Sequence, residues 1–381
     1  MKKIKTIKRR QFLQAAAVIP GASMLGLIPQ SLSAENGEAK KLNILFLGGT
    51  GFIGPHMVRK CLSQGYSVTL FNRGKRNSNL FPGLETIIGN RDPKVDEGLK
   101  GLKGRTWDVV IDTSGYIPRH VAASAEMLKD AVDHYLFIST VSVYSDFSIP
   151  DMTEDAPLAQ LEDPSTEQIT GETYGGLKVL CEKAVTDAYG ERATVLRPTF
   201  IIGPGDHTDR FIHYIHRPLQ GGRMAVPGKP DNPISYIDVR DLAEFVEHAI
   251  SKRIIGTYNV VNQHKSATFG QLLESSITAS NSDVETTWID TEFLTAQQKI
   301  MGEDYRMFPM WLDQDNPEYG GYPSNAKAVA AGLTYRPFEQ TVTDTYKWWI
   351  EQPQERRDKR RDLVSQEFEE ALLAAWDKRD S

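Results

Sequence analysis

A glycine-rich turn between an apolar run and an amphipathic stretch sets the tightest limit on how this chain can fold. Leu42–Leu47 is almost entirely apolar, and Gly48, Gly51 and Gly54 separate it from the amphipathic residues 56–64. Such a run is typical of a parallel strand that is covered on both faces. Between a strand and a helix, glycines at this spacing allow a tight turn, a close approach of the backbone to a pyrophosphate, and close helix packing. The segment therefore predicts a dinucleotide-binding unit.

Strand-like and helix-like patterns alternate after this turn. Helical periodicity is clearest over 119–131 and 174–189. This alternation predicts an α/β fold, a Rossmann-type doubly wound parallel sheet with a smaller mixed α/β substrate domain. The further strand candidates are 66–71, 84–88, 107–111, 134–138 and 194–197. The expected domains are a dinucleotide-binding Rossmann domain over 41–200, a substrate-binding cap over 201–345 that is interleaved with it, and a charged C-terminal helix over 346–381.

The first residues have the layout of an export signal. Residues 1–10 are strongly cationic, residues 15–28 are modestly apolar, and small polar residues follow. Arg9-Arg10 before Phe12-Leu13 resembles a twin-arginine signal, whose pathway carries folded proteins. We predict a signal peptide over 1–34 and export by the twin-arginine translocase, to the periplasm or elsewhere outside the cytoplasm. A Sec signal or a plain basic tail are the alternatives.

Charge and cysteine usage exclude some classes of function. The net charge of −6 argues against a general nucleic-acid binder, which needs a basic face to meet phosphates. Cys61 and Cys181 lie in apolar-periodic stretches and predict buried free thiols, although one disulfide remains open. His207, His213 and His216 are close in sequence, and His213 and His216 could share a helix face, but no fixed third ligand is evident, so we predict no metal site. We expect a small-molecule substrate.

Two further segments carry groups suited to proton transfer. Tyr174 and Lys178 are four residues apart on the predicted helix and share a face. An ammonium group beside a phenol lowers the phenol pKa, so Tyr174 could act as a general acid or base. Gly175 and Gly176 each weaken the helix by about 1 kcal/mol, which suggests that something packs closely there. Thr140 follows strand 134–138, at the edge where open α/β sheets bind ligands.

In this order, the three motifs resemble the extended short-chain dehydrogenase/reductase family, of the NAD-dependent epimerase/dehydratase type. The resemblance covers about 42–262 and includes Leu196–Pro198, Gly203-Pro204 and Tyr236–Asp241. It implies that Tyr174 takes a hydroxyl proton while hydride passes to a nicotinamide. It also implies that Thr140 steadies the reacting oxygen and that Lys178 binds the nicotinamide ribose.

The resemblance also implies which residues contact the ligands. The implied catalytic residues are Thr140, Tyr174 and Lys178. The implied cofactor-binding residues are Gly48, Thr50, Gly51, Phe52, Ile53, Gly54, Asn72, Arg73, Asn90, Thr113, Ser114, Lys178, Pro198 and Thr199. The expected substrate-binding residues are Tyr116, Thr140, Asp206 and Arg210.

Three positions depart from the pattern of the family. Asn72-Arg73 stands where many NAD-using members have Asp, which favours NADP and leaves NAD open. Val141-Ser142 stands where 4,6-dehydratases have Asp-Glu, which argues against that reaction. Ile234 stands where nucleotide-sugar epimerases place an Arg on the diphosphate, so a nucleotide-sugar substrate is in doubt.

Export and these departures together suggest a closed reaction cycle with a retained cofactor. Epimerisation or oxidation-assisted elimination on a free sugar or polyol needs no external electron acceptor. The alternatives are an NADP-dependent carbonyl or sugar reductase, and a nucleotide-binding relative without catalysis. A homodimer is a further expectation from the family.

Overall fold

The computed structural model describes residues 41–301, 308–313, 316 and 320–379. The predicted signal peptide therefore lies outside the described residues. No helix among the described residues is both long and apolar enough to cross a bilayer.

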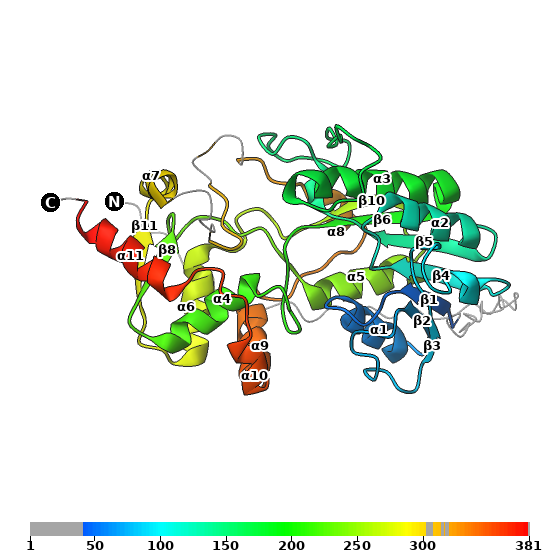
Figure 1. The fold of residues 1–381 in the computed structure, drawn as a ribbon, viewed down its shortest axis with the longest axis horizontal. Coiled ribbons are helices and arrows are strands. Elements are labelled where there is room, and N and C mark those ends of the chain that lie inside the picture. The colour runs from blue at the N-terminus through cyan, green and yellow to red at the C-terminus, as the bar shows by residue number, and fades with distance from the viewer. Residues whose placement is uncertain (1–40, 302–307, 314–315, 317–319, 380–381) are drawn as a thin grey trace, which may run out of the picture. The chain divides into compact units, whose positions relative to one another are not determined.

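A seven-stranded, fully parallel sheet is formed by strands that lie between residues 43 and 260 (Figure 1). Its strand order is β10-β6-β5-β4-β1-β2-β3, so the order reverses on either side of β1. This is the doubly wound sheet that the sequence predicts. The strands are β1 (Asn43–Leu47), β2 (Ser67–Asn72), β3 (Glu85–Ile88), β4 (Trp107–Asp112), β5 (Val132–Ile138), β6 (Ala193–Pro198) and β10 (Gly256–Val260).

Helices cover both faces of this sheet. In Figure 1, α1 (Gly54–Ser63) and α5 (Val239–Ser251) lie on one face, and α2 (Pro118–Leu128) and α3 (Gly171–Tyr189) lie on the other. Side chains of β1 alternate between the two resulting cores: Ile44 packs on the α1/α5 side and Leu45 on the α2/α3 side. Burial on both faces explains why β1 is a continuous apolar run.

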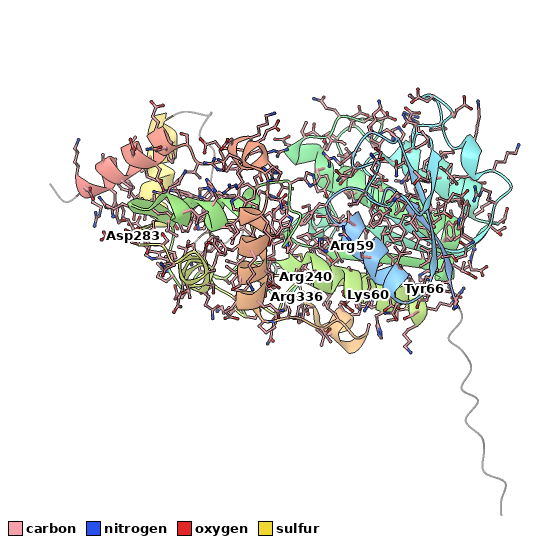
Figure 2. All side chains as sticks on the ribbon, turned by 90° about the horizontal axis from the view of Figure 1, so that it is seen from below. Arg59, Lys60, Tyr66, Arg240, Asp283 and Arg336 are labelled. Carbon is pink, nitrogen blue, oxygen red and sulfur yellow. The ribbon has the colours of Figure 1, made fainter. Side chains whose placement is uncertain are left out.

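Ion pairs connect the start of α5 to the chain before α9 (Phe338–Ile350). Figure 2 shows Arg240 and Arg336 side by side, and both reach the buried carboxylate of Asp238. Arg336 also pairs with Asp241 at 2.7 Å. These contacts fix the start of α9 against α5.

A second core forms around helices and two short sheets. Phe211, Tyr214 and Trp349 are fully buried in it. Its two-stranded sheets are β8 (Arg223–Pro227) with β11 (Glu285–Ile289), and β7 (Ile201–Ile202) with β9 (Ile237–Asp238). The remaining helices are α4 (Arg210–His216), α6 (Phe269–Ser280), α7 (Thr291–Met301), α8 (Ala326–Ala330), α10 (Gln354–Asp358) and α11 (Gln366–Asp377). The 3-10 turns are η1 (Lys100–Leu102), η2 (Val141–Val143), η3 (Gly190–Arg192) and η4 (Arg217–Gln220).

Two expectations are settled at this level. The single charged helix expected over 346–381 is wrong, because α10 and α11 are separate helices that follow the end of α9. Pro353 begins α10, and the Ser365 hydroxyl accepts a hydrogen bond from the Phe368 amide to begin α11. Cys61 and Cys181 are buried free thiols, as predicted, on opposite faces of the sheet. The open disulfide alternative is therefore excluded.

Candidate functional site

A cavity of about 1110 Å³ lies at the carboxyl edge of the parallel sheet, next to the β1 position where the strand order reverses. Its volume exceeds the usual range for one small ligand, so it has room for a dinucleotide together with a substrate. Every residue that the resemblance assigned to cofactor, catalysis or substrate lines this cavity, with the exception of Asp206.

The glycines between β1 and α1 serve different structural needs. Gly48 has φ +112° and Gly49 has φ +90°, values that side chains with a Cβ rarely adopt. A Cβ on Gly54 would lie 2.5 Å from the Gly49 carbonyl carbon, so Gly54 closes the turn on itself. A Cβ on Gly51 would meet no protein atom within 4 Å. Gly51 therefore leaves open the space that a ligand's phosphates would need in front of the α1 N–H groups.

Cations gather where β2 ends. Arg73, Lys75 and Arg76 all line the cavity there. The side-chain Oδ1 of Asn72 accepts a hydrogen bond from the Gly74 amide at 2.8 Å, so this side chain is bound within its own turn. This end of the cavity thus offers positive charge and no carboxylate from position 72.

Thr140 and Tyr174 come together from different elements. Thr140 caps η2, and its Oγ1 accepts a hydrogen bond from the Ser142 amide at 3.1 Å. Tyr174 lies in the first turn of α3 and shares a hydrogen bond with the Thr140 side chain. Both hydroxyls therefore face one place at the carboxyl edge of the sheet.

The two glycines after Tyr174 allow this approach. A Cβ on Gly175 would lie 2.1 Å from the Ser142 carbonyl oxygen, and one on Gly176 would lie 2.6 Å from the Leu161 side chain. The close packing that the sequence suggested is therefore confirmed. It brings the first turns of α3 against η2, which carries Thr140 at its start.

Burial controls the proton of Tyr174. The pKa of Tyr174 is raised to about 12, chiefly by desolvation, and the neighbouring Tyr116 acts in the same direction. The hydrogen bond from Thr140 and the charge of Arg210 act in the opposite direction but are smaller. The expectation that Lys178 lowers this pKa is thus wrong for the ligand-free pocket, because loss of water around the phenol dominates.

Lys178 is fixed by the main chain instead. Its Nζ donates to the carbonyl oxygens of Gly115 at 2.7 Å and Ile138 at 2.8 Å, and lies 4.1 Å from the centre of the Phe137 ring. Burial lowers the pKa of Lys178 to about 8. The ammonium joins the ends of β4 and β5, and its position on the cavity wall leaves it available to a ligand hydroxyl.

A buried ion pair supports the floor of the cavity. Arg91 donates to both carboxylate oxygens of Asp112, at 2.6 and 2.9 Å, and Tyr135 donates to the same carboxylate at 2.7 Å. Arg91 also donates to the Ser114 hydroxyl at 3.2 Å. Sequence reasoning missed this pair, since its two residues are 21 positions apart and belong to no common motif.

Apolar side chains from distant loops line the opposite wall. We call this wall the loop side, defined by Phe147, Ile169, Met310, Leu312 and Tyr322, and the wall formed by 48–54 and the end of β2 the glycine-turn side. Ile169 and Leu312 are exposed at the surface. The sequence carries no signal for the loop side, because isolated apolar residues in loops have no periodicity.

The segment before α4 places Arg210 in the cavity and Asp206 outside its lining. Asp206 is buried, and its Oδ1 accepts hydrogen bonds from the Thr208 amide and hydroxyl. Asp206 therefore shapes the turn, in place of the substrate contact that we expected. Asp209 has φ +61° and binds Arg356 through both carboxylate oxygens, which ties α4 to α10.

Metal chemistry finds no support among the residues that the structure describes. They contain no cluster of three or more His, Cys, Asp or Glu side chains that could hold a metal ion. His216 accepts a hydrogen bond from Trp349 Nε1 at 3.0 Å, and burial, followed by the charges of cationic neighbours, lowers the pKa of His213 to about 3.

Comparisons with known proteins agree with this architecture. Over 171 residues the chain is 30% identical to UDP-glucose 4-epimerase from Neisseria meningitidis, a match covering 38% of the chain and 48% of that protein. Over 218 residues it is 28% identical to the chloroplast stem-loop binding protein of 41 kDa b from Arabidopsis thaliana, a match covering 52% and 53%. The chain thus spans about half the length of these curated relatives.

Solved structures share the fold at low identity. The Bordetella bronchiseptica enzyme WbmH in complex with NAD+ superimposes with a TM-score of 0.60 at 17% identity, covering 81% of this chain and 99% of that one. The model of the NAD dependent epimerase/dehydratase family matches residues 44–126 and 105–262, more than half of the chain. The chain therefore belongs to the NAD dependent epimerase/dehydratase family.

Proposed function

We propose that this protein binds NAD or NADP in the cavity and oxidises and re-reduces a sugar or polyol there, with Tyr174 as the proton-transfer group. One observation carries the proposal. The glycine turn, Thr140, Tyr174 and Lys178 open into a single cavity whose far wall could hold a second, smaller molecule.

The residues of the glycine-turn side fit a dinucleotide. The open space at Gly51 and the N–H groups at the start of α1 would hold a pyrophosphate. Lys178 would donate a hydrogen bond to a ribose hydroxyl, because its buried ammonium group still donates hydrogen bonds. The bound nicotinamide supplies the chemistry that the side chains lack, accepting a hydride from a substrate C–H bond and returning it.

Tyr174 then has to exchange a proton with a substrate hydroxyl. The raised pKa of Tyr174 keeps its phenol protonated near neutral pH in the free protein. Tyr174 therefore acts most readily as the acid that gives a proton to the oxygen of a carbonyl group as that group is reduced. Removing a hydroxyl proton requires the pKa to fall, and an oxidised nicotinamide brings positive charge into the same cavity. Thr140 would hold the reacting oxygen.

A closed cycle on a free sugar suits export. Sugar chemistry is supported by the similarity to UDP-glucose 4-epimerase. Ile234 is buried and does not line the cavity, so the position that could pair a diphosphate offers no cation. Export by the twin-arginine translocase would carry the folded protein with its dinucleotide, and epimerisation or oxidation-assisted elimination would regenerate that cofactor in place.

The cofactor is proposed to be NADP in preference to NAD. Arg73, Lys75 and Arg76 line the cavity after β2, where guanidinium and ammonium groups favour a 2′-phosphate. Titrating the protein with both oxidised cofactors tests this choice. Tighter binding of NADP, reversed in Arg73→Glu, would support it, and tighter binding of NAD by the unaltered protein would overturn it.

The reaction is tested with cofactor-loaded protein and a panel of free sugars and polyols. We expect an isomer or an eliminated product to form while the total of reduced cofactor stays constant. Tyr174→Phe should bind cofactor and form no product. Steady release of reduced cofactor without isomer or eliminated product would overturn the closed cycle. Turnover of added NADPH with ketones would instead favour a reductase, the second candidate that the cations after β2 support.

A further inference from the structure

Arg210, the first residue of α4, is a cation in the cavity that makes no ion pair with the described residues. Its Nε donates to the Thr208 hydroxyl at 3.2 Å, and its guanidinium carbon lies 4.9 Å from the centre of the Phe200 ring. Neither Nη1 nor Nη2 makes a hydrogen bond to the described residues, and no ion pair of that part of the chain includes Arg210. Phe200 and Arg210 both line the cavity, so this contact holds the guanidinium at the cavity wall.

The two acids just before it in sequence form no ion pair with it, although the charge of Asp206 acts on Arg210 through space. The Oδ1 atom of Asp206 is taken by Thr208, and its Oδ2 is buried without any hydrogen-bond partner. Asp209 gives both of its oxygens to Arg356. A half-buried guanidinium that lacks a paired carboxylate is unfavourable unless a ligand supplies one.

Arg210 also differs from the other cations of the cavity. Arg91 is paired with Asp112, and Lys178 is bonded to two carbonyl oxygens. The cations after β2 follow the glycine-turn side in the chain, and among them Arg76 lies 3.2 Å from His207 Nε2. Arg210 is near enough to Tyr174 for its charge to lower the phenol pKa, so it stands at the reacting end of the cavity.

The surroundings favour a singly charged group over a diphosphate. One guanidinium matches one carboxylate in a two-point hydrogen bond. A diphosphate carries two charges, and Ile234, which stands where the resemblance places an Arg on the diphosphate, is apolar and buried. The loop side is apolar.

We propose that the substrate carries a carboxylate, which Arg210 binds close to the carbon that reacts, so that the protein acts on a sugar acid of the hexuronate type. This inference rests on the proposed function. Arg210 is then the residue that distinguishes an acidic sugar from its neutral counterpart.

Matched pairs of probes test the proposal on full-length protein loaded with cofactor. D-Glucuronate is compared with D-glucose, and D-galacturonate with D-galactose, by calorimetric binding and by chromatography of any isomer or eliminated product. We expect each acid to bind about 100-fold more tightly than its neutral partner, as for a charge pair withdrawn from water. Arg210→Gln should remove this preference, and Arg210→Lys should restore part of it.

Control variants separate specificity from folding and from chemistry. Arg223→Gln removes an exposed guanidinium that pairs with Asp377, and it should leave the acid preference unchanged. Tyr174→Phe should keep the acid preference in binding and form no isomer or eliminated product. Acid-selective binding by unaltered protein that forms no isomer or eliminated product would therefore reject the proposed reaction while supporting the role of Arg210.

Two results would overturn the proposal that the substrate carries a carboxylate. The first is equal binding of acid and neutral partners, or a preference that survives in Arg210→Gln with an unchanged thermal midpoint. The second is tighter binding of D-glucose 6-phosphate or UDP-glucose than of D-glucuronate, which would assign Arg210 to a phosphate.

Discussion

The glycine-turn side and the loop side of the cavity are built in different ways. The glycine-turn side consists of main chain, with Gly48, Gly49 and Gly54 held by the continuation of β1 into α1. The loop side consists of side chains from segments far apart in the sequence, and Arg210 lines the same cavity. Main-chain recognition depends on a few glycines and is shared across a family, whereas side-chain recognition can change one loop at a time. We therefore expect substitutions on the two sides to affect different ligands.

The largest effect is expected where the two sides meet, at Tyr174. Tyr174→Phe removes only the hydroxyl, and turnover should fall by about 1000-fold, as for loss of a general acid or base. Cofactor affinity and the thermal midpoint should stay close to those of the unaltered protein. Steady-state rates measure the turnover, cofactor titration measures the affinity, and thermal unfolding gives the midpoint. Turnover within about tenfold of the original would mean that another group moves the proton.

Two alanine substitutions test the glycine-turn side. Gly54→Ala places a Cβ against the Gly49 backbone and should lower the free energy of unfolding by about 3 kcal/mol. Gly51→Ala meets no protein atom, so stability should hold while dinucleotide affinity falls at least about tenfold. Urea unfolding of dinucleotide-free protein and cofactor titration give the two readings. Unchanged cofactor affinity in Gly51→Ala would remove this turn from the binding site.

The contact between α4 and α10 tests the loop side. Arg356→Ala leaves the buried Asp209 carboxylate with the Arg361 amide as its remaining partner, and should cost about 2 kcal/mol of unfolding free energy. Substrate binding should weaken, because Asp209 precedes Arg210, and dinucleotide affinity should not change. Arg357→Ala, which loses a bond to Gln354, is the matched control. Equal losses of both ligands would contradict the separation of the two sides.

The smallest effect concerns Lys178 and pH. Burial lowers its pKa to about 8 in the folded protein, against about 10.4 when the chain is unfolded. Between these values the unfolded chain binds more protons, so stability rises with pH, by at most about 1.4 kcal/mol per pH unit. Urea unfolding of dinucleotide-free protein from neutral to alkaline pH should show this rise. It should be absent in Lys178→Met, and an equal rise in both proteins would assign it to other groups.

The sequence was most informative where structure depends on the main chain. The alternation of patterns predicted the parallel sheet, and the Gly175-Gly176 pair correctly indicated close packing, because both follow from backbone geometry. The raised pKa of Tyr174 was not predictable, since it depends on how much water the folded cavity excludes. The Arg91–Asp112 pair and the loop side depend on contacts between distant segments, for which a single sequence holds no local pattern.

The contact between α3 and η2 limits which substitutions in α3 can make the protein more thermostable. Replacing helical glycine with alanine is an ordinary route to thermostability, and α3 offers three candidates. Two of them are closed, because a methyl group at Gly175 or Gly176 would push the helix off its neighbours. Gly171 has open space around it and ordinary backbone angles, so the same helix can be stiffened at its first residue, in the turn that carries Tyr174, without a steric clash.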